Sequence, residues 1–400
     1  MSVSVLKGIK VLDFSRILAA PYASQLLADH GATVWKIERP GTGDEVRRWA
    51  PPEINGQSCY FLTVNRSKQS VCVDLGKKEG LELARKLALK SDVLLENFKT
   101  GQMKKFSLDY ETLSKMNERL IYCSITGYGS TGPYANDPGF DVIAEAIGGF
   151  MSITGPKDGE PCKAGVAVID LLTGMHAFSG ILIALLNRQQ TGEGQRVECN
   201  LLATQMATLA NIASNYLNSG KLGKAWGTEH ESIVPYQAFR TQDDRYYVVG
   251  AADNKAFKEL VNLMDLPELA ADPDYETNPK RVQNREKLLK IIGDRFASKP
   301  LDYWRSHLRS RHFPSGPVNN IEEAFDFEQT KHLNLVQPVE HPQYGQVKTV
   351  GNTTVYSSIH NGPRNAPPLL GEHTKSVLQE ELEIDDRKLE ELREKGVVGW

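Results

Sequence analysis

The first half of the chain alternates short apolar runs with amphipathic segments. GIKVLDF predicts a strand, YASQLLADH predicts a helix that ends at Gly31, and TVWKIE predicts a second strand. The same order recurs in SVCVDL, KKEGLELARKLALKS and DVLLENF, and LIYCSIT and RVECNLL add two more apolar runs. Strands separated by helices in this way predict a mostly parallel sheet with helices on both faces, a Rossmann-like α/β fold.

One junction of interest is AVIDLLTG, residues 167–174. GVAV before it predicts a short strand, and the apolar residues 171–186 predict a helix buried on most sides. Asp170 would then be the N-cap, and Asp170→Ala would cost about 1 kcal/mol of stability. The helix contains His176 and two glycines and is shorter than the roughly 20 residues of a membrane span, so we expect no membrane segment.

The composition changes after residue 220, where the glycine-bearing link KLGKAWGTEHES begins. YQAFRTQDDRYYVVG predicts a β-hairpin around residues 242–244, and NREKLLKIIGDRF and PLDYWRSHL predict amphipathic helices. We therefore expect the first part of a large α/β domain over residues 1–220, a smaller α+β domain over 225–325, and a return segment over 326–400 that completes the large domain.

Bulk composition narrows the classes of function. The 400 residues include 47 basic and 50 acidic side chains, and this net charge of -3 argues against non-specific nucleic-acid binding. Five cysteines without a CxxC pair favour a reducing compartment and no structural metal. The N-terminus shows no leader, so we expect a cytoplasmic protein, or a mitochondrial matrix protein if this is a mature eukaryotic chain.

Two local patterns bear on ligand binding. Gly127-x-Gly129-x-x-Gly132 matches a dinucleotide fingerprint by letter, but Pro133 and NDPG follow where that motif needs a helix. A glycine-rich turn that lines a substrate pocket is the better interpretation. Basic residues gather near the predicted strand ends and favour a phosphorylated or carboxylated ligand. They are Arg16, Arg39, Arg47, Arg48, Arg66, Lys68, Lys99 and Lys105.

The chain resembles the class III CoA-transferases, the formyl-CoA transferase and carnitine CoA-transferase family, in seven ordered motifs. They are GIKVLDFSRILAAPYASQLLADHGATVWKIERPG, VNRSKQSVCVDL, ENFKTG, SITGYGSTGPY, PGFDVIAEAIGG, VAVIDLLTGMHA and PLLGEHT. NLLATQMATLANIASNYL and WGTEHESIVPYQAF are most similar to the succinate–hydroxymethylglutarate CoA-transferase branch. The resemblance implies an interlocked homodimer whose active site needs both chains, a CoA thioester as substrate, and no permanently bound cofactor or metal.

The resemblance also implies that Asp170 is the nucleophile. Its carboxylate would attack an acyl-CoA to give a mixed anhydride, and the released CoA thiolate would convert this anhydride into an aspartyl-CoA thioester. The incoming acid would then react with this thioester and run the same steps in reverse. We expect the helix N-terminus to keep Asp170 ionised and nearby backbone N–H groups to hold the oxyanion. The GYGSTG and GAADN segments would exclude water, although GAADN carries less glycine than the loop of close relatives, which leaves its role as a lid open.

The same resemblance implies two further groups of residues. Positions that match CoA contacts are Arg39, Val73, Asp74, Leu75, Asn97, Phe98, Lys99, Lys105, Gly139, Phe140 and Asp141.

A dicarboxylate substrate needs a cation for its distal carboxylate. Arg16 is the first candidate for it, Arg47 the second, and Gly129 is the third residue expected to face the substrate. The alternative for Arg16 is an ion pair with Asp13 or with a CoA phosphate.

Two other functions stay open at this point. A 2-methylacyl-CoA racemase needs an acid and a base beside the α-carbon, and relatives of that kind carry a GHD motif. Here the motif is Gly139-Phe140-Asp141, so the histidine is missing. A CoA-binding protein without catalysis is the second alternative, against which the intact Asp170 argues.

Overall fold

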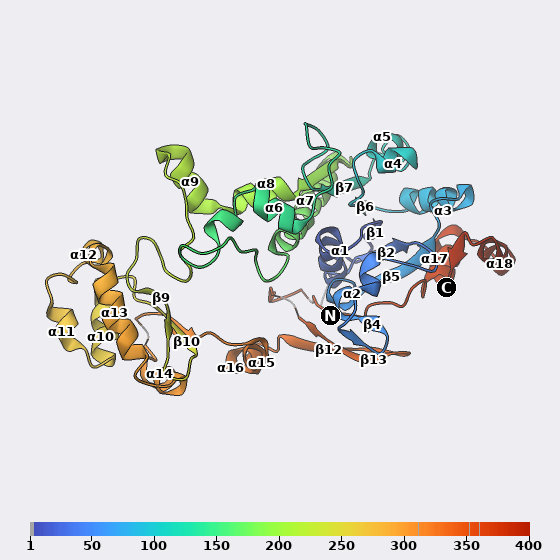
Figure 1. The fold of residues 1–400 in the computed structure, drawn as a ribbon. Helices are drawn as coiled ribbons and strands as arrows, with labels where there is room; N and C mark the ends of the chain where they lie inside the picture. The colour runs from blue at the N-terminus through green and yellow to red at the C-terminus, as the bar shows by residue number, and fades with distance from the viewer. Residues whose placement is uncertain (1–3, 311, 352, 360) are drawn as a thin grey trace. The chain divides into compact units, whose positions relative to one another are not determined.

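The computed structural model describes residues 4–310, 312–351, 353–359 and 361–400 (Figure 1). It divides into two compact units. Unit 1 comprises Met1–Phe150, Ala164–Lys221 and Lys331–Trp400, and unit 2 comprises Met151–Lys163 and Leu222–Thr330. Asp170 and most of the other predicted site residues lie in unit 1.

Unit 1 is built on a seven-stranded sheet in the order β14-β5-β2-β1-β6-β7-β8. Its strands are β1 (Lys10–Asp13), β2 (Thr33–Glu38), β5 (Gln69–Val73), β6 (Val93–Glu96), β7 (Ile121–Thr126), β8 (Arg196–Asn200) and β14 (Val398–Gly399). Six of them run parallel, and β14 pairs antiparallel with β5 at the edge. The predicted Rossmann-like fold is confirmed. The strand order reverses between β1 and β6, and such a switch point places ligands beyond the carboxyl ends of these strands.

Helices cover both faces of this sheet (Figure 1). On one face α1 (Ala19–Asp29) and α7 (Val168–Thr191) pack over apolar side chains such as Val34, Val93 and Ile121. On the other, α3 (Lys78–Leu89), α17 (Thr374–Leu382) and α18 (Asp386–Glu394) pack over Leu12 and Trp35. The C-terminal segment thus completes the core of unit 1.

Shorter elements connect these layers. They are η1 (Glu45–Arg48), β3 (Glu53–Ile54), β4 (Gln57–Ser58), α2 (Cys59–Thr63), α4 (Gln102–Lys105), α5 (Tyr110–Leu113), α6 (Asp141–Ile147), α8 (Leu201–Thr208), α9 (Ala210–Ser219), β12 (Val336–His341) and β13 (Gly345–Val350). β12 and β13 form an antiparallel hairpin within unit 1.

Helix α7 differs from the expected helix in two respects. The strand predicted at GVAV is absent, because residues 161–167 form bends and irregular chain. The helix itself covers 24 residues, and only 39% of its most apolar stretch is buried. Among the described residues it is the one helix long and apolar enough to cross a membrane, a test that core helices of globular proteins also pass. The expectation that this helix is buried on most sides is therefore wrong, because most of its apolar stretch is not buried.

Unit 2 combines a small sheet with helices. Its sheet contains β9 (Tyr236–Arg240), β10 (Tyr246–Gly250) and β11 (Ser315–Pro317), and β9 and β10 form the predicted hairpin. In its core Phe239 stacks on Phe296, and Trp304 packs against Phe296 at a tilt of 52°. The other elements of residues 151–332 are η2 (Met151–Ile153), α10 (Asn254–Leu263), α11 (Pro267–Ala271), α12 (Asn278–Gln283), α13 (Arg285–Phe296), α14 (Leu301–His307), α15 (Ile321–Asp326) and α16 (Glu328–His332).

Candidate active site

Asp170 is the third residue of α7 and lies in its first turn. Ala167 occupies the N-cap position, and no side chain caps the helix from there. The predicted N-cap role of Asp170 is therefore wrong, and the stability loss expected from removing an N-cap no longer has a basis in this structure. Its half-buried carboxylate instead belongs to the helix and lies near the positive end of the helix dipole.

Asp141 supplies the cap that α7 lacks. It is the first residue of α6, and its Oδ1 accepts the backbone N–H groups of Ile169 at 2.7 Å and of Asp170 at 3.0 Å. The first N–H groups of a helix have no partner within it, so a carboxylate from another element can satisfy them. Asp141 occupies these two donors, so an oxyanion would need other N–H groups, and the expected oxyanion site stays a prediction.

Close backbone contacts bring Asp141 to this position. A Cβ on Gly127 would lie 2.7 Å from the Cα of Gly139, and a Cβ on Gly139 would lie 2.5 Å from the Cα of Gly127, so neither position accommodates a side chain. Gly129 adopts a φ of 96° and donates its N–H to Thr126 Oγ1 at 2.9 Å. The glycine-rich motif is therefore a packed turn that leads into α6, as the interpretation against a dinucleotide site predicted.

Helix α7 also lies directly against the start of α1. A Cβ on Gly174 would approach the carbonyl oxygen of Ala19 to 2.5 Å. Residues four apart share one face of a helix, so Asp170 lies on the face of α7 that meets this segment. The nucleophile candidate thus lies one turn before the point at which α7 contacts α1.

Burial and the negative charge of Asp141 raise the pKa of Asp170 to about 7. Both causes disfavour the carboxylate, because it loses hydration and faces a like charge. The helix N-terminus therefore does not keep Asp170 fully ionised at neutral pH, which corrects the earlier expectation. A carboxylate with a raised pKa is a stronger nucleophile once ionised, and such shifts are typical of functional sites.

The raised pKa of Asp170 predicts that activity falls on the acid side (the acid limb) of the pH–rate profile. We expect kcat/KM for an acyl-CoA to fall by up to about tenfold per pH unit below pH 7 and to level off above it, because only the carboxylate attacks. Asp141→Asn keeps an oxygen for the two N–H groups and removes the charge, so it should move the limb to lower pH. Initial rates from pH 5 to 9 test this, and a limb that Asp141→Asn leaves in place would contradict it.

Tyr60 is a site residue that the sequence analysis missed. It lies in α2, and burial together with the charges of Asp170 and Asp141 raises the pKa of its phenol, so the hydroxyl stays a neutral donor. Trp49 contacts the Tyr60 ring edge-on at 4.9 Å between centroids. The sequence carries no signal for this placement, because Tyr60 is more than 80 residues from either aspartate.

A cavity of about 480 Å³ opens at the carboxyl ends of β1, β2 and β5. Its walls include cations and three phenylalanines, Phe14, Phe98 and Phe106, which suit phosphates and an aromatic base. The predicted residues that line it are Arg16, Arg39, Val73, Asp74, Leu75 and Phe98. Arg48 lines it as well.

The other predicted CoA contacts lie outside this lining. Lys99 and Lys105 are exposed on the segment after Phe98. Gly139, Phe140 and Asp141 lie at the start of α6, next to the first turn of α7. The amide of Asn97 is bonded to the backbone of Arg16. The structure thus separates the predicted set into a group around the cavity and a group beside Asp170.

Several of the predicted basic residues are engaged with buried acids. Arg47 forms two hydrogen bonds with Glu38, at 2.7 and 2.6 Å, and its guanidinium stacks on Phe61 at 3.7 Å. Arg66 pairs with Asp29, and Lys68 with Asp13. Burial lowers the pKa of Lys68 to about 8 despite the charge of Asp13. These three cations stabilise the fold around the site, whereas Arg16, Arg39 and Arg48 face the cavity.

Two further expectations concern loops and metals. GAADN runs from the end of β10 into α10 within unit 2, where Asp253 caps α10 by accepting the N–H of Ala256 at 2.8 Å. Its role as a lid stays a prediction.

Within the described ranges, no group of three or more His, Cys, Asp or Glu side chains could hold a metal ion.

Comparison with known proteins shows the family to which this fold and sequence are similar. The sequence model of the family described as CoA-transferase family III matches residues 6–374. A succinyl-CoA:glutarate CoA-transferase of Mus musculus is 44% identical over 397 residues, covering 99% of this chain and 91% of that protein. A succinate–glutarate CoA-transferase of Agrobacterium fabrum is 39% identical, covering 94% and 95%. The crystal structure of a CAIB/BAIF family protein from Brucella suis matches with a TM-score of 0.87 and 37% identity, covering 95% of this chain and all of that one.

Proposed function

The chain belongs to CoA-transferase family III, and on that premise we propose that it moves CoA from succinyl-CoA to glutarate or a dicarboxylate of similar length through covalent intermediates on Asp170. The observation that carries this proposal is the half-buried Asp170 carboxylate in the first turn of α7, where Asp141 accepts the backbone N–H of Asp170. The names of the two relatives support the choice of substrates.

The proposed sequence of steps balances without any other reactant. Asp170 attacks the thioester carbonyl, the C–S bond breaks, and a mixed anhydride and CoA thiolate form. The thiolate then attacks the aspartyl carbonyl and releases succinate, which leaves an aspartyl-CoA thioester. Glutarate attacks this thioester to give a second anhydride, and the thiolate takes the glutaryl group and restores Asp170.

An aspartate suits this chemistry better than a serine would. Anhydride and thioester are both high-energy acyl species, so the free energy of the thioester is kept through every intermediate. A serine ester would lose it. Burial and the charges of Asp170 and Asp141 raise the pKa of Tyr60, so its phenol stays protonated, and we propose it as a hydrogen-bond donor to the tetrahedral oxyanion.

CoA is proposed to bind in the cavity at the ends of β1, β2 and β5. Arg39 and Arg48 offer guanidinium groups to its phosphates, and Phe98 offers a ring to its base. Arg16 lines the same cavity from the segment that leads to α1. We assign it to the distal carboxylate of the acid. Arg47, the second candidate, is bonded to Glu38, and neither Arg47 nor Gly129 is among the residues that line this cavity.

We further propose that two chains form an interlocked homodimer. Large apolar side chains are exposed on the outer face of α7, at Ile183 (66%) and Leu186 (60%), and on α9 at Leu217 (78%). A separate cavity of about 960 Å³ between α1, α7 and β13 also has largely apolar walls. A second copy would cover such surfaces. Light scattering should give twice the 44.5 kDa mass of one chain, and a monomer would contradict the proposal.

A panel of acids tests the proposed reaction. The purified protein is incubated with succinyl-CoA and one acid at a time, and mass spectrometry follows new acyl-CoA species. Glutarate and hydroxymethylglutarate should give products, while acetate and butyrate should give far less. No new acyl-CoA with any acid would contradict the proposal.

The same assay separates the racemase alternative. A racemase exchanges deuterium from the solvent at C2 of a 2-methylacyl-CoA without any acceptor acid. We expect no such exchange, because Phe140 stands where racemase relatives carry histidine. Exchange without an acid would favour the racemase.

A further inference from the structure

The turn that follows β1 is held by a side chain from the neighbouring strand. Arg16 donates its backbone N–H to Asn97 Oδ1 at 2.9 Å, and Asn97 Nδ2 donates to the Arg16 carbonyl at 2.8 Å. β1 and β6 are parallel neighbours, so these residues follow the two strands at which the sheet order reverses. Both ends of the Asn97 amide are therefore used on the backbone of one residue.

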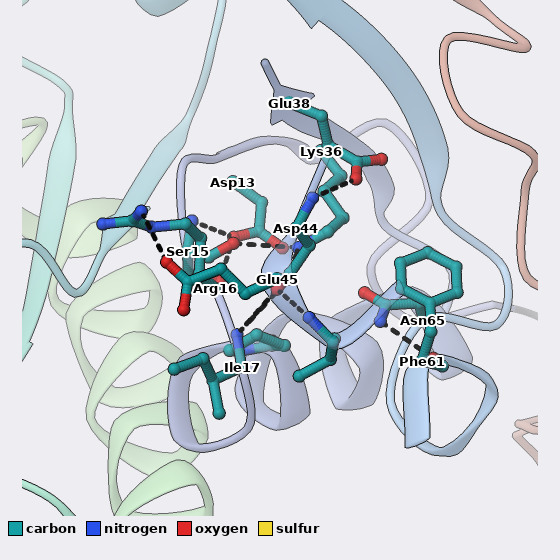
Figure 2. Close-up of polar contacts among 12 residues, drawn as sticks. Asp13, Ser15, Arg16, Ile17, Lys36, Glu38, Asp44, Glu45, Phe61 and Asn65 are labelled. Atoms are coloured by element: carbon teal, nitrogen blue, oxygen red, sulfur yellow. Dashed lines mark hydrogen bonds and ion pairs between the residues drawn. The ribbon is translucent and has the colours of Figure 1, made fainter. Parts of the chain in front are cut away.

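Buried charges hold the residues on either side of Arg16. Lys36 donates to the carbonyl of Ser15 and to Asp44 Oδ2, both at 2.8 Å, and Asp44 accepts the N–H of Ile17 at 3.2 Å (Figure 2). Lys36 and Asp44 are almost fully buried. The charge of Asp44 raises the pKa of Lys36 against the effect of burial, so the pair stays ionised.

The backbone of this turn is strained. Ile17 adopts a φ of 71°, a left-handed conformation that β-branched residues rarely take. Strain of this kind persists only where the surroundings impose it, and it is frequent at functional sites. Here Asp44 fixes the strained residue and Asn97 fixes the residue before it.

The guanidinium of Arg16 is directed by the same loop that holds its backbone. It lies over the ring of Phe98 at 4.8 Å. An exposed ion pair with Glu45 at 3.5 Å, shown in Figure 2, is its one described salt bridge. An exposed pair of this length contributes little, so the side chain stays available to a ligand. Asn97 thus holds the backbone of Arg16, and Phe98 contacts its guanidinium.

We propose that Asn97 is a positioning residue for Arg16, so that its amide sets the affinity for the acid substrate without touching it. This rests on the proposed function, in which Arg16 binds the distal carboxylate. A long flexible side chain loses less freedom on binding when its backbone and its guanidinium are already placed. Removing the Asn97 amide frees the backbone of residue 16 and lets the strained turn relax.

A double-mutant cycle tests this with Asn97→Ala, Arg16→Ala and the double variant. Asn97→Ala should raise KM for glutarate by about three- to tenfold with kcat nearly unchanged, a coupling usual for residues in contact. In the Arg16→Ala background it should raise KM no further. The Tm should fall equally in both backgrounds, because Asn97 bonds the backbone of position 16 in each.

Asn117→Ala is the matched control. Asn117 also joins two backbone segments, donating to the Ser91 carbonyl at 3.1 Å and accepting the N–H of Arg119 at 3.2 Å, but it is not among the residues that line the cavity. It should lower the Tm and leave both KM values unchanged. If Asn97→Ala fails to fold, Asn97→Leu replaces it, because leucine has a similar volume and lacks both the donor and the acceptor toward Arg16.

Each outcome decides one point. An equal rise of KM in both backgrounds, or none in either, would overturn the positioning role of Asn97. A rise that depends on Arg16 but appears in KM for succinyl-CoA would support the positioning role and overturn the assignment of Arg16 to the acid.

Discussion

Asp170→Ala is expected to abolish CoA transfer while leaving the fold and the affinity for CoA close to those of the wild type. Every proposed step forms or breaks a bond to this carboxylate, and Asp141 still caps α7 through the backbone of residues 169 and 170. Initial rates with succinyl-CoA and glutarate, together with CoA titration, test both parts. More than a few per cent of residual activity would contradict the assignment.

Asp170→Asn provides a stability control for that result. The folded protein holds the proton of Asp170 more tightly than the unfolded chain, since its pKa rises from 3.8 to about 7. The stabilisation from this group is therefore complete below pH 4 and is lost as the pH rises through 7. The amide of the variant cannot ionise. The Tm of Asp170→Asn should therefore exceed that of the wild type by more at pH 8 than at pH 5.

Arg16→Ala is expected to raise KM for dicarboxylates by about tenfold or more and to leave KM for monocarboxylates nearly unchanged, in line with the roughly 1.5–3 kcal/mol of a charged hydrogen bond. The distal carboxylate of a dicarboxylate would otherwise be desolvated without a partner. Arg16→Lys should already weaken binding, because a lysine cannot form the planar two-bond contact.

Arg39→Ala is the comparison for Arg16. It lines the same cavity from the end of β2, and we expect it to raise KM for succinyl-CoA and to leave the preference among acids unchanged. Equal losses for both classes of acid in Arg16→Ala would show that Arg16 serves CoA or the fold. The acid panel with both variants separates these patterns.

The fold was predictable because its sheet is made of local, repeating units. Apolar runs such as VLDF and VLLE match β1 and β6, and their alternation with helices is sufficient for the parallel topology. The strand expected at GVAV was wrong because a short apolar run also begins an apolar helix, and the sequence carries no local signal that separates the two.

The site was predictable only in part because its contacts join distant segments. The motifs of the family identified Asp170 and the residues around the cavity. The same motifs could not show that Asp141 caps α7, that Tyr60 lies near both aspartates, or that Arg47 is bonded to Glu38. Each of these depends on tertiary contacts between residues that the chain keeps far apart.

Transfer of heavy oxygen to Asp170 tests the central proposal most directly. When glutarate attacks the aspartyl-CoA thioester, one of its carboxylate oxygens becomes the bridge of the anhydride and stays on Asp170 when the thiolate takes the glutaryl group. One turnover with ¹⁸O-labelled glutarate should therefore add about 2 Da to the peptide that contains Asp170. An unlabelled peptide, with the heavy oxygen found directly in succinate, would contradict the covalent role of Asp170.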